Sequence, residues 1–230
     1  MRRDRNAAEV EIPGAGDALP GYLARPPSGH GPGVLVLHEA FGLEDHIRDV
    51  CDRLARAGFV ALAPDLYRGR RGGSLDEAVR LAAELEPEGV AADLESAVGA
   101  LLNEDAVAGS RVGVVGFCMG GHLALLAASS SPRVAAAVDF YGFHPGLPID
   151  VSRIEGAVLG IFAENDEFVP AETVDALRAE LEAAGRRASF HVEPGVGHAF
   201  MNDSRPDRHD AAAAAAGWDR MLAFLRAELT

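Results

Sequence analysis

Cysteine is scarce in this sequence of 230 residues, which contains Cys51, Cys118 and no others. Two cysteines are too few for a disulfide framework, and neither belongs to a Cys-x-x-Cys pair or to a cysteine–histidine spacing typical of a metal site. We therefore expect free thiols and a reducing compartment.

Long apolar segments are also lacking. No stretch approaches eighteen uncharged apolar residues, and the first residues mix arginines with acids instead of leading into an apolar signal-peptide core. Positive charge is low as well, since 21 Lys and Arg stand against 35 Asp and Glu, a formal net charge of −14. This balance disfavours binding to phosphate backbones and to anionic lipid surfaces. We expect a cytoplasmic protein that binds neither nucleic acid nor membrane.

Hydrophobic residues make up 48% of the chain, which is enough for one full core. The predicted connections are short and no linker is visible, so we expect a single domain over residues 1–230. From about residue 33 onward, short apolar runs typical of strands alternate with longer helical patterns, as in βαβ units with a mostly parallel sheet. Strands are predicted at 33–38, 58–63, 111–117, 134–140, 157–163 and 188–193.

Two further segments near the N-terminus, AEVEIP and GYLARP, are predicted to pair as a hairpin at the edge of the sheet. The helical segments carry apolar residues three and four positions apart. The expected fold is therefore α/β, with a mostly parallel twisted sheet of about eight strands and helices on both faces. Helices are predicted at 44–57, 74–102 with a break at Pro87, 119–129, 171–184 and 209–229.

The segment GFCMGG places Cys118 where the strand 111–117 turns into a helix. With serine in the middle, this pattern is the nucleophile elbow of an α/β-hydrolase, in which side chains two before and two after the nucleophile would collide with neighbouring elements. Gly116 and Gly120 meet that need. The turn also aims the amide of Met119 at a reacting carbonyl, and the helix that begins there adds the positive end of its dipole. The alternative is a small buried cysteine at a glycine-rich helix start.

A thiol nucleophile needs a base and a group that orients the base, and α/β-hydrolases supply them from later loops in the order nucleophile, acid, histidine. The loop after strand 157–163 offers three carboxylates, of which Asp166 is our candidate and Glu164 and Glu167 are expected to be solvated or helix-entry charges. His198 follows strand 188–193 in a glycine-flanked loop, so we expect it to be the base.

The second oxyanion donor is expected in the loop after strand 33–38, where the amide of Ala40 is the natural candidate. Glu39 in this loop is unusual for an esterase. A carboxylate near a developing oxyanion opposes catalysis unless it is protonated or turned toward the thiol.

These motifs together resemble the dienelactone hydrolase family, in the right order and over nearly the whole chain. The segments that carry the resemblance are HEAFG at 38–42, APDLY at 63–67, GFCMGG at 116–121, DEFVP at 166–170 and GHAF at 197–200.

The resemblance implies a hydrolase of small carboxylic esters or lactones, of the carboxymethylenebutenolidase type, with no metal or cofactor. It implies Cys118 as nucleophile, His198 as base and Asp166 as the acid that orients it. In that family the glutamate that matches Glu39 pairs with the resting cysteine and receives its proton when substrate arrives. A thiolate expels enolates readily and amines poorly, so activated esters and lactones are the expected substrates, and peptides are not.

Family members bind a substrate carboxylate through arginines, one of them four residues after the catalytic histidine, where this sequence has Asn202. No other arginine matches that role, so Arg68, Arg70, Arg71, Arg80 and Arg205 are interpreted as solvated charges. The substrate-binding residues expected from position are Tyr67, Phe41, Tyr141 and Asn202.

Two alternatives remain at this point: a general carboxylesterase acting on other activated esters, and a redox-sensing or binding protein that presents the Cys118 thiol without turnover. We expect a monomer or a small homo-oligomer.

Overall fold

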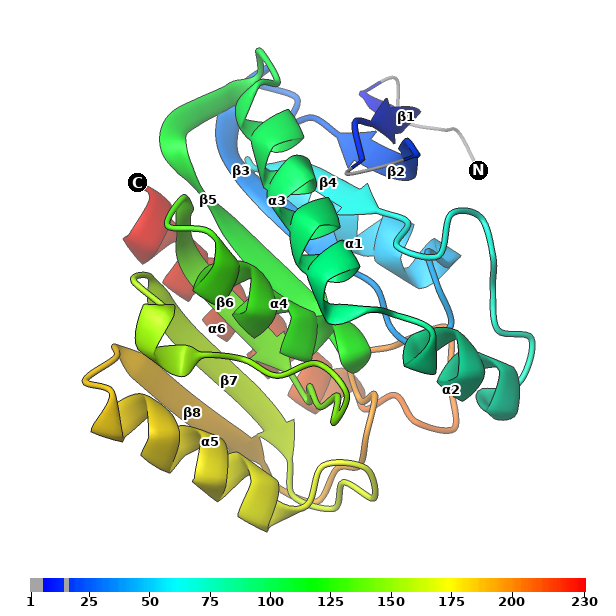
Figure 1. Ribbon diagram of the computed structural model, residues 1–230, viewed down its shortest axis with the longest axis vertical. Coiled ribbons are helices and arrows are strands. Elements are labelled where there is room, and N and C mark those ends of the chain that lie inside the picture. The colour runs from blue at the N-terminus through cyan, green and yellow to red at the C-terminus, as the bar shows by residue number, and fades with distance from the viewer. Residues whose placement is uncertain (1–5, 15–16) are drawn as a thin grey trace.

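The computed structural model describes residues 6–14 and 17–230, and its eight strands form one sheet. The strand order is β1-β2-β4-β3-β5-β6-β7-β8 (Figure 1). The strands are β1 (Ala7–Ile12), β2 (Leu19–Ala24), β3 (Gly31–Leu37), β4 (Val60–Pro64), β5 (Val107–Phe117), β6 (Val134–Phe140), β7 (Ala157–Ala163) and β8 (Ala188–Glu193).

The N-terminal hairpin predicted from the sequence is confirmed. β1 pairs with β2 antiparallel, β2 pairs antiparallel with β4, and all other neighbours are parallel. Strand β4 begins at Val60, two residues later than predicted, because Gly58 takes a left-handed conformation (φ 102°) directly after the preceding helix and turns the chain back toward the sheet.

Helices cover both faces of the sheet. The helices are α1 (Asp45–Arg56), α2 (Leu75–Ala83), α3 (Pro87–Leu102), α4 (Met119–Ser130), α5 (Ala171–Ala183) and α6 (Ala211–Leu229), with a short 3-10 turn at Val151–Arg153. Side chains alternate across the strands, so Val34 and Val36 pack in the core beneath α1 and α6. Leu35 and Leu37 pack in the opposite core, beneath α3 and α4.

The break predicted at Pro87 separates α2 from α3, and Pro87 opens α3 at a position where its missing N–H is not needed. Helix α2 is short and capped by Ser74, whose side chain accepts a hydrogen bond from the amide of Glu77. Of its nine residues, Ala78 and Leu81 are buried. Helix α2 therefore does not belong to either helical layer but lies beyond the carboxyl ends of the strands (Figure 1).

The connections diverge at β3. The chain leaves β3 for β4 on one side, and returns through α2 and α3 to β5 on the other. In open parallel sheets, a crevice forms outside the carboxyl ends of strands at such a point. The loops that follow β3 and β5 carry Glu39–Ala40 and Cys118, so the topology brings these predicted site residues to one place.

Candidate active site

Cys118 lies at the sharp turn between β5 and α4, with φ 53° and ψ −125°. Its amide donates to the carbonyl of Phe140 at 3.0 Å, which holds the turn against β6. A Cβ on Gly116 would lie 1.7 Å from the carbonyl oxygen of Gly120, and one on Gly120 would lie 2.3 Å from that of Leu37. Positive φ at a non-glycine residue is strained by about 1–3 kcal/mol, and such strain is typical of functional sites.

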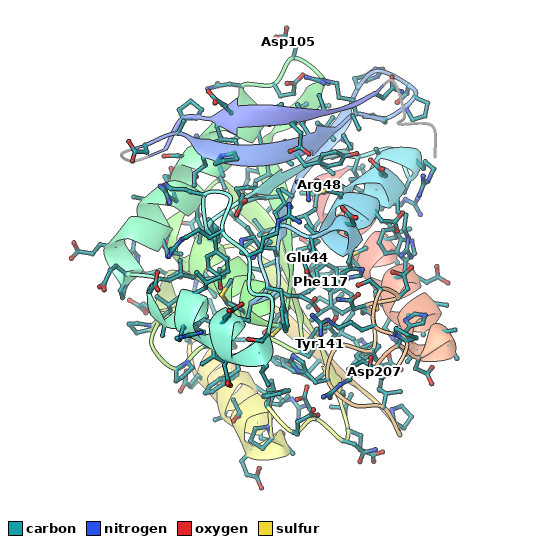
Figure 2. All side chains as sticks on the ribbon, turned by 90° about the vertical axis from the view of Figure 1, so that its right-hand side faces the viewer. Glu44, Arg48, Asp105, Phe117, Tyr141 and Asp207 are labelled. Carbon is teal, nitrogen blue, oxygen red and sulfur yellow. The ribbon has the colours of Figure 1, made fainter. Side chains whose placement is uncertain are left out.

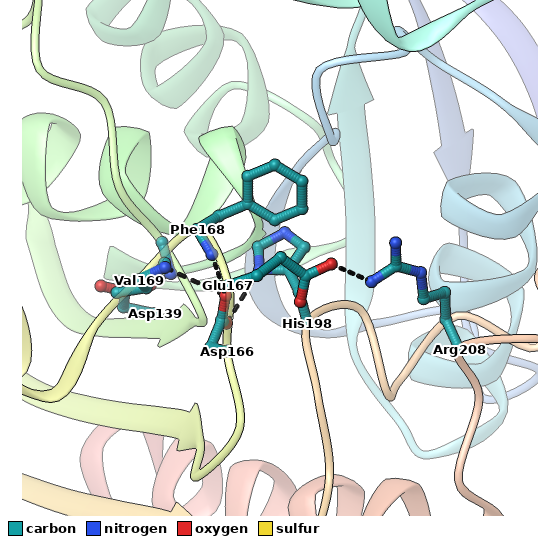
Figure 3. Close-up of polar contacts among 8 residues, drawn as sticks. Asp139, Asp166, Glu167, Phe168, Val169, His198 and Arg208 are labelled. Carbon is teal, nitrogen blue, oxygen red and sulfur yellow. Dashed lines mark hydrogen bonds and ion pairs between the residues drawn. The ribbon is translucent and has the colours of Figure 1, made fainter.

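His198 and Asp166 form a hydrogen-bonded pair at the carboxyl edge of the sheet. The two oxygens of Asp166 lie 2.9 and 3.1 Å from Nδ1 of His198. The same carboxylate accepts the amides of Phe168 and Val169 at 2.8 and 3.0 Å (Figure 3). Asp166 is thus held by two backbone donors, and it fixes the His198 tautomer with the proton on Nδ1, leaving Nε2 for the thiol.

Opposing effects act on the pKa of His198. Burial lowers it, but hydrogen bonds to Asp166 and Cys118 outweigh burial and raise the pKa to about 10. The ring is enclosed by Tyr141 and Phe168, whose ring centroids lie 4.9 and 5.0 Å away in edge-on contact. The charged imidazolium form of His198 is therefore stabilised next to Cys118. In that form, His198 can act as the acid that a thiol nucleophile needs beside it.

The loop after β3 is pinned by His38. Its Nε2 accepts the amide of Leu66 at 3.2 Å, so its Nδ1 carries the proton and donates to the carbonyl of Glu39 at 2.7 Å. Ala40 follows directly and lines the same cavity as Cys118 and Met119. Met119 is the first residue of α4, where amides have no intrahelical acceptor. The two predicted oxyanion donors are therefore on segments that meet at the nucleophile.

Glu39 is buried, with 5% of its surface exposed. Its Oε2 accepts a hydrogen bond from the Asn202 side chain at 2.6 Å, and its Oε1 has no hydrogen-bond partner among the described residues. Burial raises the pKa of this carboxyl, while Asn202, His198 and Arg205 act in the opposite direction. A carboxylate in this setting is poised to accept a proton.

A cavity of about 1070 Å³ opens over these residues. Phe41 and Tyr141, predicted as substrate-binding residues, line it, whereas Tyr67 and Asn202 do not. Tyr67 is buried and donates its hydroxyl to the sulfur of Met119 at 3.2 Å, so it supports the elbow from behind. Asn202 is fully buried and supports Glu39. Sequence position alone did not separate lining residues from those one layer deeper.

The structure corrects the interpretation of Arg205 as a solvated charge. Arg205 lines the cavity, and its guanidinium lies 3.9 Å from the ring centroid of Phe41 and 4.0 Å from the carboxylate of Glu44. Arg68 and Arg70 are paired instead with Asp93 and Glu84. The fold brings Arg205 back over the loop after β3, which lies far from it in the sequence.

Several lining residues were missed by sequence reasoning, among them Leu75 and Val79 of α2 and Phe168 in the loop after β7. The signal for the α2 residues was present in the sequence, where apolar residues at positions 75, 79 and 82 share one helical face beside the buried Ala78 and Leu81.

Two searches over the described ranges, 6–14 and 17–230, gave negative results. They contain no cluster of three or more His, Cys, Asp or Glu side chains arranged to hold a metal ion. None of their helices combines the length and apolar character needed to cross a bilayer.

Comparison with known proteins places the chain in a family. The dienelactone hydrolase family model matches residues 19–229. An Escherichia coli K12 protein named "Putative carboxymethylenebutenolidase" is 37% identical over 237 residues, which cover 96% of this chain and 86% of that protein. "Protein usf" of Aquifex pyrophilus is 36% identical over 228 residues, covering 96% of this chain and 98% of its own length.

Solved structures agree with this result. The "Putative Dienelactone Hydrolase" of Klebsiella pneumoniae has a TM-score of 0.88 at 33% identity, covering 96% of this chain and 98% of its own. A "Dienelactone Hydrolase-like Promiscuous Phospotriesterase" from metagenomic libraries has a TM-score of 0.86 at 27% identity, covering 97% and 98%. The α/β-hydrolase fold expected from the sequence is confirmed, and the chain belongs to the dienelactone hydrolase family.

Proposed function

We propose that this protein hydrolyses activated carboxylic esters or lactones, with Cys118 as nucleophile and His198 and Asp166 as its base and orienting acid. The observation that carries the proposal is the hydrogen-bonded Asp166–His198 pair, whose histidine lines the same cavity of about 1070 Å³ as Cys118. Family membership and the names of the relatives agree with an ester or lactone hydrolase.

In the first half-reaction, Glu39 takes the thiol proton and the sulfur of Cys118 attacks the ester carbonyl carbon. The amides of Met119 and Ala40 bind the oxyanion, and the neutralised Glu39 no longer opposes the negative charge. When the tetrahedral intermediate collapses, the bond from carbon to the leaving oxygen breaks. The leaving oxygen takes a proton from the His198 imidazolium as it departs, which leaves a neutral imidazole and a thioester.

In the second half-reaction, His198 removes a proton from water, and the hydroxide formed attacks the thioester carbonyl. The carbon–sulfur bond breaks, the acid product leaves, and the thiolate recovers its proton from Glu39. Asp166 keeps the imidazole oriented and stabilises its charged form in both halves.

The proton-accepting role of Glu39 is supported by its surroundings. It is buried within the cavity that holds Cys118, and one carboxylate oxygen has no hydrogen-bond partner among the described residues. Its raised pKa brings the carboxyl closer to neutrality than that of an exposed glutamate. Such a group can take a proton from a thiol without a large energetic cost.

The test is an assay of wild type, Cys118→Ala and Cys118→Ser on dienelactones, aryl esters and other lactones, with mass spectrometry of acyl adducts. We expect turnover and an adduct of residue 118 in wild type, and loss of both in Cys118→Ala. Cys51→Ala is the matched control, because Cys51 is fully buried in α1, remote from the cavity lining, and its loss should spare both signals. Thiol labelling without hydrolysis of any ester would instead favour the redox-sensing alternative.

A broader carboxylesterase activity is the second candidate. It is favoured by Asn202, which stands where the family resemblance implies a carboxylate-binding arginine and which donates its hydrogen bond to Glu39 instead. Turnover of aryl acetates without turnover of dienelactone would select this candidate over the narrower one.

A further inference from the structure

The cavity is large for a small lactone. Sites for drug-sized ligands occupy about 300–1,000 Å³, and this one measures about 1070 Å³. A substrate with only a few carbons on each side of the scissile bond would leave most of this space to water.

Exposed apolar side chains are concentrated here. The described residues include five large hydrophobic side chains that are substantially exposed: Leu75, Val79, Phe143, Phe168 and Val192. All but Val192 line the cavity. Large apolar side chains left in water at one concave site mark a binding surface.

Three of these exposed side chains, Leu75, Val79 and Phe143, line one part of the cavity together with the partly buried Ala82 and Leu85. We name these five residues the apolar arm. Leu75 and Val79 are 52% and 57% exposed, and Phe143 is 42% exposed. Helix α2 presents them because residues three and four apart share a helical face. Ala78 and Leu81, on its other face, are buried and anchor it.

The two walls of the apolar arm are joined by His144. Its Nδ1 accepts the amide of Gly146 at 3.2 Å, so its Nε2 carries the proton and donates to the carbonyl of Ala82 at 3.1 Å. This bond ties the loop after β6 to the last turn of α2. The apolar arm is therefore a formed feature of the cavity.

Apart from Glu39 beside Cys118 and Glu86 next to Leu85, the charged lining residues lie at the other end of the cavity. Glu44 precedes α1, and Arg205, Asp207 and Arg208 lie in the segment after His198. Figure 2 shows α2 on one side of Tyr141 and the segment that carries Asp207 on the other. An apolar group of a substrate would therefore bury the most apolar surface against α2. A polar group would bind near Arg205.

The position of the apolar arm indicates which part of an ester it takes. The leaving oxygen must lie on the His198 side of Cys118 to receive a proton. His198 leads into the segment with the charged lining residues Arg205, Asp207 and Arg208, whereas α2 lies on the other side of Tyr141 (Figure 2). The acyl chain, which extends away from the leaving group, therefore points toward α2.

We propose that the apolar arm binds the acyl group of the substrate, and that the preferred substrates are esters of apolar acids of about six or more carbons. The proposal rests on the proposed hydrolase function and narrows its substrate class. It places Leu75 and Val79 as the residues that set chain-length preference.

The test is kcat/KM for 4-nitrophenyl acetate, butyrate, hexanoate and octanoate. With one buried methylene worth about a two- to fourfold gain, the four extra methylenes of hexanoate should raise kcat/KM of wild type by about tenfold or more over acetate. The double variant Leu75→Ser/Val79→Ser should lose most of that gain, so that its ratio of kcat/KM for hexanoate over acetate falls toward one. Both side chains are more than half exposed, so the fold should tolerate the change. Val192→Ser is the matched control, since Val192 is 48% exposed on β8 and outside the cavity lining.

A flat or falling series in wild type, or equal losses in the double variant and Val192→Ser, would overturn the proposal. A gain from phenyl to 2-naphthyl acetate without one along the acyl series would overturn the acyl assignment. If no ester were hydrolysed at all, the proposed function would fail first. In that case the fluorescence of N-phenyl-1-naphthylamine tests the arm, with weaker binding to the double variant than to Val192→Ser expected, and equal binding refuting it.

Discussion

Asp139, near the end of β6, should make the free energy of unfolding of this protein depend on pH. The substitution Asp139→Asn measures that contribution by itself. Asp139 is fully buried directly behind the nucleophile elbow, where a Cβ on Gly121 or on Gly142 would lie 2.2 Å from its Oδ1. Its Oδ1 accepts the amide of Gly142 at 2.7 Å, and its Oδ2 has no hydrogen-bond partner among the described residues. Burial raises the pKa of this carboxyl from 3.8 to about 7, against the opposing effect of the Gly142 bond.

The sign follows from proton binding. Between pH 4 and pH 7 the folded protein keeps a proton on Asp139 that the unfolded chain has released. The contribution of Asp139 to the free energy of unfolding therefore falls as pH rises through this window, and levels off above it. A difference of about three pH units at about 1.36 kcal/mol each amounts to about 4 kcal/mol.

Asp139→Asn removes the ionisation and keeps the oxygen that accepts from Gly142. The free energy of unfolding of Asp139→Asn minus that of wild type should therefore increase by up to about 4 kcal/mol as the pH rises from 4 to 8. Any constant cost of burying the new amide group adds equally at every pH. Turnover should be retained, because the Gly142 bond holds the turn that carries Tyr141 against His198.

The measurement is urea unfolding of wild type and Asp139→Asn at half-unit steps from pH 4.5 to pH 8.5, with linear extrapolation to water. Asp219→Asn, an exposed carboxylate on α6, controls for the change in net charge. Parallel stability profiles for wild type and Asp139→Asn would refute the reasoning, since they would mean that Asp139 titrates alike in the folded and unfolded states.

Three further outcomes concern the site. Asp166→Asn should lower kcat by about 10²- to 10⁴-fold by removing the group that orients and charges His198, and a variant with near wild-type kcat would contradict that role. Gly116→Ala should abolish turnover and lower the Tm measured by circular dichroism, because its Cβ would lie 1.7 Å from a backbone carbonyl; wild-type values would argue against the tight elbow. Asn202→Ala removes a hydrogen bond that lowers the pKa of Glu39, so the acid limb of the kcat/KM profile should move to higher pH; an unmoved limb would show that Glu39 does not titrate in the reaction.

Local patterns determined much of the fold. Every strand and helix predicted from alternation, helical spacing and turn residues is present, and boundary differences are of a few residues. Helix α6 illustrates why the boundaries differ so little. The side chain of Asp210 accepts hydrogen bonds from the amides of Ala212 and Ala213, so the helix begins at Ala211, two residues after the predicted start. Such caps, glycine turns and proline breaks act within a few residues, and a sequence displays them directly.

The residues proposed for chemistry were also visible locally. Cys118 is marked by its flanking glycines and the strand before it, and Asp166 and His198 by their places after later strands. Parallel strands end at a common edge, so residues that follow strand ends meet there. The distance of 2.9 Å between Asp166 and His198 agrees with that rule.

Tertiary structure alone decided what surrounds these groups. Asn202 and Glu39 are 163 residues apart in the chain yet share a 2.6 Å hydrogen bond. Arg205 reaches the ring of Phe41, and α2 lies over the cavity instead of on the sheet. A sequence reveals which residues follow strand ends because that depends on backbone pattern. Which side chain lines a cavity and which lies one layer behind it depends on how distant segments pack, and spacing such as that in α2 indicates a shared face without showing what that face covers.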